Sequence, residues 1–251
     1  MRRGNIPMSD YPDSAYRANG LFDELLSMLR SDDSTVRRVA IAELPELGER
    51  AIQPLVEALQ DEDFVNVQNA AFALGEMGSE SAVRALLGLF GRSDQAAQVM
   101  IFTVLGMIGG ETAVSWLLYI LANNKDWNYQ IYAARALGEI GDPHAVPKLI
   151  EVMQTGWRDV RSVAADALGR IGDEAAVPAL LEALQSHNWS KRGRFPYAVT
   201  HALASIGGRD AALGLAEALN NSDSDVQQAA TEALNCIDQA ATMVKRPRST
   251  E

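Results

Sequence analysis

The chain has 251 residues, of which 47% are hydrophobic, so it can bury a sizeable core and is not disordered throughout. Its formal net charge of −11 repels phosphate backbones, which makes nucleic acid a poor partner. The single cysteine, Cys236, excludes an intrachain disulfide framework and an all-cysteine metal site, and it suits a reducing compartment.

The first 19 residues precede the regular pattern of the chain. Arg2 and Arg3 are followed by no long apolar segment, so this stretch does not have the pattern of a secretory signal. No apolar run in the sequence approaches the ~20 residues that a membrane-spanning helix needs. We therefore expect residues 1–19 to be a poorly ordered N-terminal extension of a cytoplasmic protein that does not insert into membranes.

From residue 20 onward a short phrase recurs about every 31 residues. It reads ELPELG at 43–48, ALGEMG at 73–78, VLGMIG at 104–109, ALGEIG at 136–141, ALGRIG at 167–172, ALASIG at 202–207 and ALNCID at 233–238. A fixed period of this length indicates stacked supersecondary units. We expect the repeats to occupy residues 20–238 and residues 239–251 to form a C-terminal tail.

Each repeat has the pattern of two helices joined by a turn, as residues 141–172 illustrate. Gly141 suits the left-handed cap that ends a helix, because a residue without Cβ enters that conformation at little cost. Asp142 supplies an N-cap oxygen, and Pro143 fits the first position of the next helix. Apolar residues then recur at helical spacing before and after a turn near 155–156, and Gly172 closes the second helix.

A short helical pair cannot bury its apolar face alone, but a stack of such pairs can. We therefore predict an all-α fold, a right-handed α-solenoid of about seven helical hairpins. The second-helix sequences, for example VRSVAADALGRIGDEAAVPALLEAL at 160–184, resemble the HEAT-like repeats of cyanobacterial phycobilin lyases and of many scaffold proteins. The resemblance covers about 220 residues and is specific for architecture.

A self-contained active site is not evident in the sequence. His144, His187 and His201 have no spacing that places two of them on one helix face as a metal pair. HEAT-repeat hydroxylases that bind iron use His-Glu dipeptides, and none of these histidines is followed by Glu. We expect no metal and no cofactor, and we expect Cys236 to be a small apolar filler in the last helix.

The resemblance implies one catalytic alternative. Phycobilin lyases attach an open-chain tetrapyrrole to a cysteine of a partner phycobiliprotein, and they act mainly by holding and orienting both reactants. One lyase subgroup carries a Gly-aromatic-Pro insertion, which Gly193-Arg194-Phe195-Pro196-Tyr197 resembles loosely, with Arg194 between the glycine and the aromatic residue. Under this alternative the chain binds a bilin, alone or as one subunit of a hetero-oligomer.

The second helices are expected to line the concave face of the solenoid, where a partner would bind. Long guanidinium and amide side chains recur there, and these groups suit carboxylates and backbone groups. The candidate partner-binding residues on this face are Arg37, Arg38, Gln98, Gln130, Arg135, Arg161 and His201. The alternative for each of them is a solvated helix face with salt bridges between repeats.

A second candidate surface is the edge formed by the turns between paired helices in repeats four to six. Trp127, Trp157 and Trp189 each lie shortly before a second helix. The insertion at 187–199 lengthens one repeat and adds three further candidates, Arg192, Arg194 and Tyr197. Interfaces favour Trp and Arg, so we expect a partner-binding edge here. The alternative is that each indole covers the end of its own repeat's core.

The leading hypothesis is a protein–protein interaction scaffold or chaperone-like binder. The resemblance implies a phycobiliprotein or another photosynthetic complex as its client. A phycobilin lyase, or a subunit of one, is the second hypothesis. A nucleic-acid enzyme resembling the HEAT-like DNA glycosylases is the third, and the acidic charge argues against it.

Overall fold

The computed structural model describes the backbone of residues 13–185 and 194–244, and the side chains of residues 20–185 and 194–237. The predictions for Trp189, Arg192 and residues 1–12 and 245–251 lie outside these described ranges. Within them the chain forms helices and no β-strand, and the helices pair as seven hairpins, as the repeat predicts.

The first helices of the hairpins are α1 (Asp13–Leu29), α3 (Ile52–Ala58), α5 (Glu80–Phe90), α7 (Glu111–Asn123), α9 (Val146–Thr155), α11 (Val177–Gln185) and α13 (Gly208–Ala218). The second helices are α2 (Ser34–Glu43), α4 (Phe64–Met77), α6 (Gln95–Ile108), α8 (Trp127–Ile140), α10 (Arg158–Ile171), α12 (Phe195–Ile206) and α14 (Ser224–Val244). Short 3₁₀ segments, η2 (Leu44–Ala51), η3 (Pro143–Ala145) and η4 (Glu174–Ala176), precede α3, α9 and α11. None of the described helices is long and apolar enough to cross a membrane.

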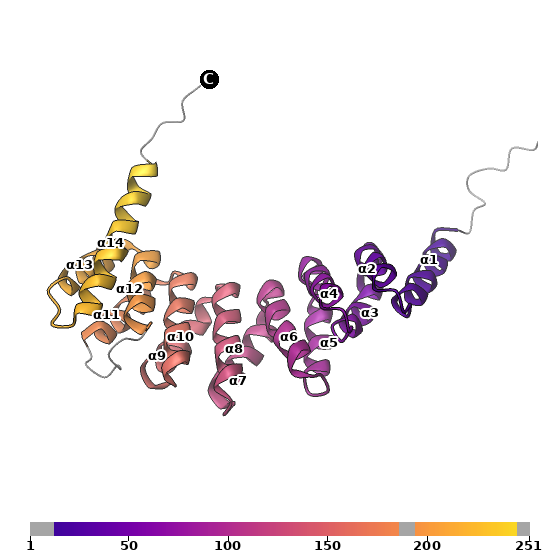
Figure 1. The fold of residues 1–251 in the computed structure, drawn as a ribbon, viewed down its shortest axis with the longest axis horizontal. Helices are drawn as coiled ribbons and strands as arrows, with labels where there is room; N and C mark the ends of the chain where they lie inside the picture. Colours follow the sequence, from indigo (N-terminus) through magenta and orange to yellow (C-terminus); the bar gives the residue numbers. More distant parts are fainter. Residues whose placement is uncertain (1–12, 186–193, 245–251) are drawn as a thin grey trace, which may run out of the picture. The chain divides into compact units, whose positions relative to one another are not determined.

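The chain divides into two compact units, unit 1 (Met1–Ile108) and unit 2 (Gly109–Glu251). In unit 1 the second helices α2, α4 and α6 pack side by side, and in unit 2 so do α8, α10, α12 and α14 (Figure 1). Each second helix also packs against the first helix of its own hairpin. Each unit is therefore a segment of α-solenoid, with its core between the two helix layers.

The predicted capping of the fifth hairpin is confirmed. Gly141 and Gly172 end α8 and α10 in the left-handed conformation, with φ of 74° and 75°. Asp142 accepts a hydrogen bond from the His144 amide, and Pro143 begins a 3₁₀ turn that leads into α9. Local cap chemistry thus sets the length of each hairpin and places its turns.

Glycine and alanine bring the second helices of unit 2 into close contact. A Cβ on Gly138 would lie 2.9 Å from the Ala167 Cα, and a Cβ on Gly169 would lie 2.7 Å from the Ala202 Cα. These distances leave no room for a methyl group between the helix backbones. The small residues of the repeated phrase therefore set the spacing of α8, α10 and α12.

The structure differs from the sequence expectations at both ends of the repeats. Helix α1 begins at Asp13, inside the stretch expected as an extension, and α14 runs to Val244, past residue 238. Cys236 is exposed, so its expected role as a core filler is wrong. Cys236 lies two residues after the repeated leucine, a position where Glu76 and Glu139 are also exposed.

Candidate functional site

The polar residues seven positions before the repeated leucine bind the turn of their own hairpin. The Gln98 amide Nε2 donates to the Phe90 and Ser93 carbonyl oxygens at 3.0 and 3.1 Å. The Gln130 Nε2 donates to the Asn124 carbonyl at 2.8 Å. Long side chains at this position therefore satisfy carbonyl groups that the end of a first helix leaves open.

Arg161 and Arg37 occupy the same position with guanidinium groups. The Arg161 Nε donates to the Met153 carbonyl at 2.8 Å, and its guanidinium lies 4.5 Å from the centre of the Phe195 ring. Burial lowers the pKa of Arg161. Its half-buried guanidinium therefore lies between its own hairpin turn and Phe195 at the start of α12.

Arg37 joins the first two hairpins of unit 1. Its Nε and Nη2 donate to the two carboxylate oxygens of Asp61 at 2.6 and 3.0 Å, and its Nη1 donates to the Ser31 and Asp32 carbonyls. Asn66 also donates to Asp61, at 3.3 Å. Long side chains suited to carboxylates and backbone carbonyls were predicted here, and in the structure the chain itself supplies those acceptors.

A second row of side chains, two positions before the repeated leucine, remains on the surface. In unit 2 it consists of exposed Arg135 on α8, half-buried Asp166 on α10 and exposed His201 on α12. Burial raises the pKa of Asp166, and the charges of Arg194, His201 and Arg135 oppose that rise. Three predicted residues, Arg135, Arg194 and His201, are therefore near enough to act electrostatically on Asp166, a carboxyl group that was not among the predicted site residues.

Tyr197 and Arg38 complete the predicted residues that the structure describes on this helix layer. Tyr197 is half-buried in the first turn of α12, and burial together with the negative charges of Glu232 and Asp225 raises its pKa. Arg38 is exposed on α2 in unit 1. The raised pKa keeps the Tyr197 phenol neutral at physiological pH, so its hydroxyl can both donate and accept a hydrogen bond.

Trp127, Trp157 and a cavity beside Trp157 lie at the hairpin turns of repeats four and five, and together they form what we call the tryptophan edge. Trp127 begins α8 and is 44% exposed, and Trp157 immediately precedes α10 and is 65% exposed. Both side chains are therefore partly exposed and partly buried against their own repeats. A large apolar ring left in water indicates a contact surface when it adjoins a concavity.

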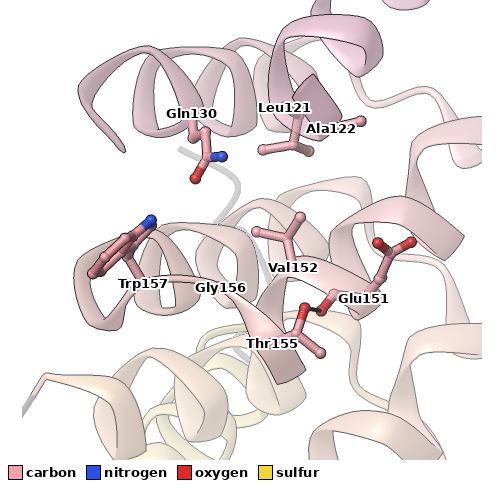
Figure 2. Close-up of a pocket in the computed structure, with 8 residues that line it drawn as sticks. All are labelled: Leu121, Ala122, Gln130, Glu151, Val152, Thr155, Gly156 and Trp157. Carbon is pink, nitrogen blue, oxygen red and sulfur yellow. Dashed lines mark hydrogen bonds between the residues drawn. The ribbon is translucent and has the colours of Figure 1, made fainter. Parts of the chain in front are cut away.

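A cavity of about 410 Å³ lies beside Trp157. Leu121, Ala122 and Gln130 lie along one side of it, and Glu151, Val152, Thr155 and Trp157 lie along the opposite side (Figure 2). Its walls are polar and apolar in about equal parts, so it can accept an apolar group and offer hydrogen bonds to it at the rim.

Hydrogen bonds hold the cavity walls in place. The Thr155 hydroxyl donates to the Glu151 carbonyl at 2.8 Å, and the Gly156 amide donates to the Val152 carbonyl at 2.8 Å. Lys148 pairs with the Glu151 carboxylate at 2.5 Å. Gly156 is required here, because a Cβ would lie 2.5 Å from the Val152 carbonyl oxygen. The cavity is therefore a preformed feature of the turn between α9 and α10.

Sequence reasoning placed the tryptophans at this edge but missed the cavity. Thr155 and Gly156 were recognised only as a turn, and Glu151 and Val152 only as part of a helix. In the described ranges, no group of three or more His, Cys, Asp or Glu side chains is arranged to hold a metal ion. The chemistry that this edge offers is recognition by an aromatic ring, apolar walls and a carboxylate.

A family model described as HEAT repeats matches residues 22–98, 88–165, 114–195 and 157–235. No protein with a curated description matches the sequence. Three solved structures illustrate its structural similarities. Human deoxyhypusine hydroxylase is 18% identical, with coverage of 90% of this chain and 98% of that chain and a TM-score of 0.46.

The phycocyanin lyase complex of CpcE and CpcF from Nostoc is 20% identical, with coverage of 95% and 99% and a TM-score of 0.36. Importin beta is 19% identical, with coverage of 90% of this chain and 32% of that chain and a TM-score of 0.45. At identities and TM-scores this low, the similarity concerns the fold alone and says nothing of function.

Proposed function

Because this chain belongs to the HEAT-repeat family, we propose that it is a protein-binding scaffold whose partner contacts the tryptophan edge of unit 2. Stacked helical repeats offer extended surfaces for other proteins and need no self-contained active site. The lone cysteine suits a reducing compartment, so we place this scaffold in the cytoplasm.

The observation that carries the proposal is Trp157, which is 65% exposed beside a preformed cavity of about 410 Å³. Tryptophan is among the residues most enriched at the energetic centre of interfaces, because its large flat ring displaces much water at little conformational cost. An apolar side chain of the partner would fill the cavity between Leu121 and Val152. The indole of Trp157 would cover it, and the Glu151 carboxylate would accept a hydrogen bond at the rim.

The charged residues of α8 and α12 would extend this contact onto the second-helix layer. Arg135, Arg194 and His201 present exposed polar groups there, whereas Gln130 and Arg161 use theirs within their own hairpins. Surface charges of this kind steer association more than they strengthen it. We therefore propose that the tryptophan edge supplies most of the affinity for the partner and that Arg135, Arg194 and His201 orient it.

The client that we favour is a phycobiliprotein or another photosynthetic complex. This choice is supported by the resemblance of the second-helix sequences to HEAT-like phycobilin lyases and phycobiliprotein chaperones. A bilin lyase, or a lyase subunit within a hetero-oligomer, would use the same edge to hold a phycobiliprotein while a bilin is attached.

The test is affinity purification of the tagged full-length chain from its native organism, with mass spectrometry and a visible absorbance scan of the eluate. We expect wild-type protein to retain one dominant partner, and Trp157→Ser to reduce the retained amount about tenfold, as loss of an interface tryptophan does. Reversing the charges of Arg192 and Arg194 together should also weaken capture, with the melting temperature nearly unchanged.

Leu213→Ser is the matched control, because Leu213 is a 52% exposed apolar residue elsewhere in unit 2. Equal capture by wild type and Trp157→Ser would refute the proposal for this edge. Visible absorbance that co-elutes with the protein after mixing with bilin favours the lyase, and a colourless complex favours the scaffold.

A further inference from the structure

Unit 1 exposes large apolar side chains on its layer of second helices. Val39 on α2, Val65 and Phe72 on α4, and Met107 on α6 are all exposed, and Phe72 is 60% exposed. Helices α2, α4 and α6 pack side by side, so these residues share one surface. We call these four residues the unit 1 strip.

One contact shows how Met107 on α6 meets helix α4. A Cβ on Gly75 would lie 2.3 Å from the Met107 Cε, so the Met107 side chain lies directly over Gly75. Gly75 follows Phe72 by three residues and therefore lies on the same face of α4. The Met107 side chain therefore reaches from α6 across to α4, so the apolar surface continues from one helix to the other.

The fold does not require apolar residues at these positions. In unit 2 the positions equivalent to Phe72 carry Arg135, Asp166 and His201. The positions equivalent to Met107 carry Glu139 and Arg170, which form an ion pair with each other. Since the same helix layer accepts charged groups at these sites, the stacking of the repeats does not by itself require the apolar residues of the strip.

Carboxylates flank the strip on both sides. At the hairpin turns that precede α2, α4 and α6, the side chains of Asp32, Asp33, Glu62 and Asp94 are exposed. At the other ends, Glu46 in η2, just after α2, and Glu76 in the last turn of α4 are also exposed. Residues 20–108 carry 14 acidic and 6 basic side chains, a net charge of −8, so most of the chain's formal charge of −11 lies in this unit.

We propose that the unit 1 strip docks a cationic amphipathic helix of a partner protein. The apolar face of that helix would cover Phe72 and Met107, and Lys or Arg side chains along its flanks would meet the two rows of carboxylates. Three second helices spaced about 8–10 Å apart present about 16–20 Å of surface, which matches about 11–14 helical residues. Exposed Arg38, beside Val39, would accept a carboxylate of the same partner.

The charge distribution favours this occupant over a second copy of the chain. Two copies joined through the strip would bring like-charged carboxylate rows together, which opposes association. The partner proposed for the tryptophan edge belongs to unit 2, so the two surfaces are tested separately.

The probe is a fluorescein-labelled peptide of Leu and Lys in amphipathic order, about 14–18 residues long, titrated with the full-length chain and followed by fluorescence anisotropy. We expect it to bind at least tenfold more tightly than a scrambled peptide of the same composition or a Leu/Glu peptide. Phe72→Ser should weaken binding about tenfold or more, because the exposed ring is the largest apolar group of the strip. Added salt should weaken binding, because it screens the attraction between the lysines of the peptide and the carboxylates that flank the strip.

Two matched controls separate docking from general attraction to an acidic protein. Leu213→Ser removes an exposed apolar residue of unit 2 and should leave the affinity unchanged. Glu62→Lys and Glu182→Lys change the net charge equally, but Glu182 lies on α11 in unit 2, so only Glu62→Lys should weaken binding severalfold.

Equal effects of the two charge reversals, or unchanged affinity in Phe72→Ser, would overturn the proposal. A wild-type dimer in sedimentation that becomes monomeric in Phe72→Ser would also overturn it, by assigning the strip to a second copy. Trp157→Ser should bind the peptide like wild type, so failure here does not depend on the tryptophan edge.

Discussion

At the scale of single residues, the long polar side chains of the second helices have divided roles. Gln98, Gln130 and Arg161 bind carbonyl groups of their own hairpin turns, while Arg135 and His201 remain exposed. One-dimensional spacing does not separate these roles, because both positions lie on the same helix and take the same residue types. The difference arises from the first helix, whose last carbonyls come within reach of only one of the two positions.

Asp61 provides a prediction at this scale. Burial alone would raise its pKa, but hydrogen bonds from Arg37, the Asp63 amide and Asn66 outweigh burial and hold the pKa below its ordinary value of 3.8. A carboxyl group with a lowered folded-state pKa stabilises the fold above about pH 4, and this stabilisation is lost as the pH falls through the folded pKa. Asp61→Asn should therefore lower the free energy of unfolding at pH 7 by about 1 kcal/mol and flatten its loss below pH 4.

Urea unfolding followed by circular dichroism at several pH values measures both effects. Glu182→Gln, which changes an exposed carboxylate of unit 2, should retain the wild-type pH profile. An Asp61→Asn variant that loses stability in acid as steeply as wild type would show that the Arg37–Asp61 pair contributes nothing to acid sensitivity.

At the scale of helices, close packing through glycine leads to opposite outcomes for one kind of substitution. Gly169→Ala would place a Cβ 2.7 Å from the Ala202 backbone on α12, so α10 and α12 must move apart. We expect a loss of about 1–3 kcal/mol in the free energy of unfolding, because overpacking outweighs the gain in helix propensity.

Gly88→Ala is the matched substitution. Gly88 also lies within a helix, α5, but no atom comes within 4 Å of its added Cβ. It should stabilise the protein by up to about 1 kcal/mol in the same thermal or urea measurement. If both variants change stability in the same direction, backbone propensity governs these sites and helix spacing does not.

Helix pairs and their caps could be predicted from the sequence because the signals are local. Gly141, Asp142 and Pro143 fix a helix end and a helix start within three residues, and the structure confirms all three. Which apolar side chains accompany Phe72 on the surface could not be predicted in this way. An apolar residue at helical spacing reads as core until the neighbouring helices show which face they cover. The cavity beside Trp157 likewise depends on how α7, α8 and α9 pack, which no spacing reveals.

At the scale of the whole molecule, the division into two compact units predicts how a local defect spreads. In stacked repeats each hairpin contacts its neighbours, so stability is a sum of local terms and cooperativity declines with distance. Asp61→Asn loosens a link between α2 and α4 in unit 1, and Gly169→Ala strains α10 against α12 in unit 2. Hydrogen exchange with mass spectrometry should therefore show faster exchange in residues 34–77 for the first variant and in residues 158–206 for the second.

In each variant the other unit should retain its wild-type protection. This result would show that the tryptophan edge and the unit 1 strip belong to units that unfold separately, so that unfolding of one unit leaves the other able to bind. Faster exchange across both units in either variant would instead show one cooperative fold. A substitution that destabilises one unit would then weaken binding at both surfaces. The binding of Leu213→Ser and Trp157→Ser would then be compared with that of wild type under conditions that give all three the same free energy of unfolding.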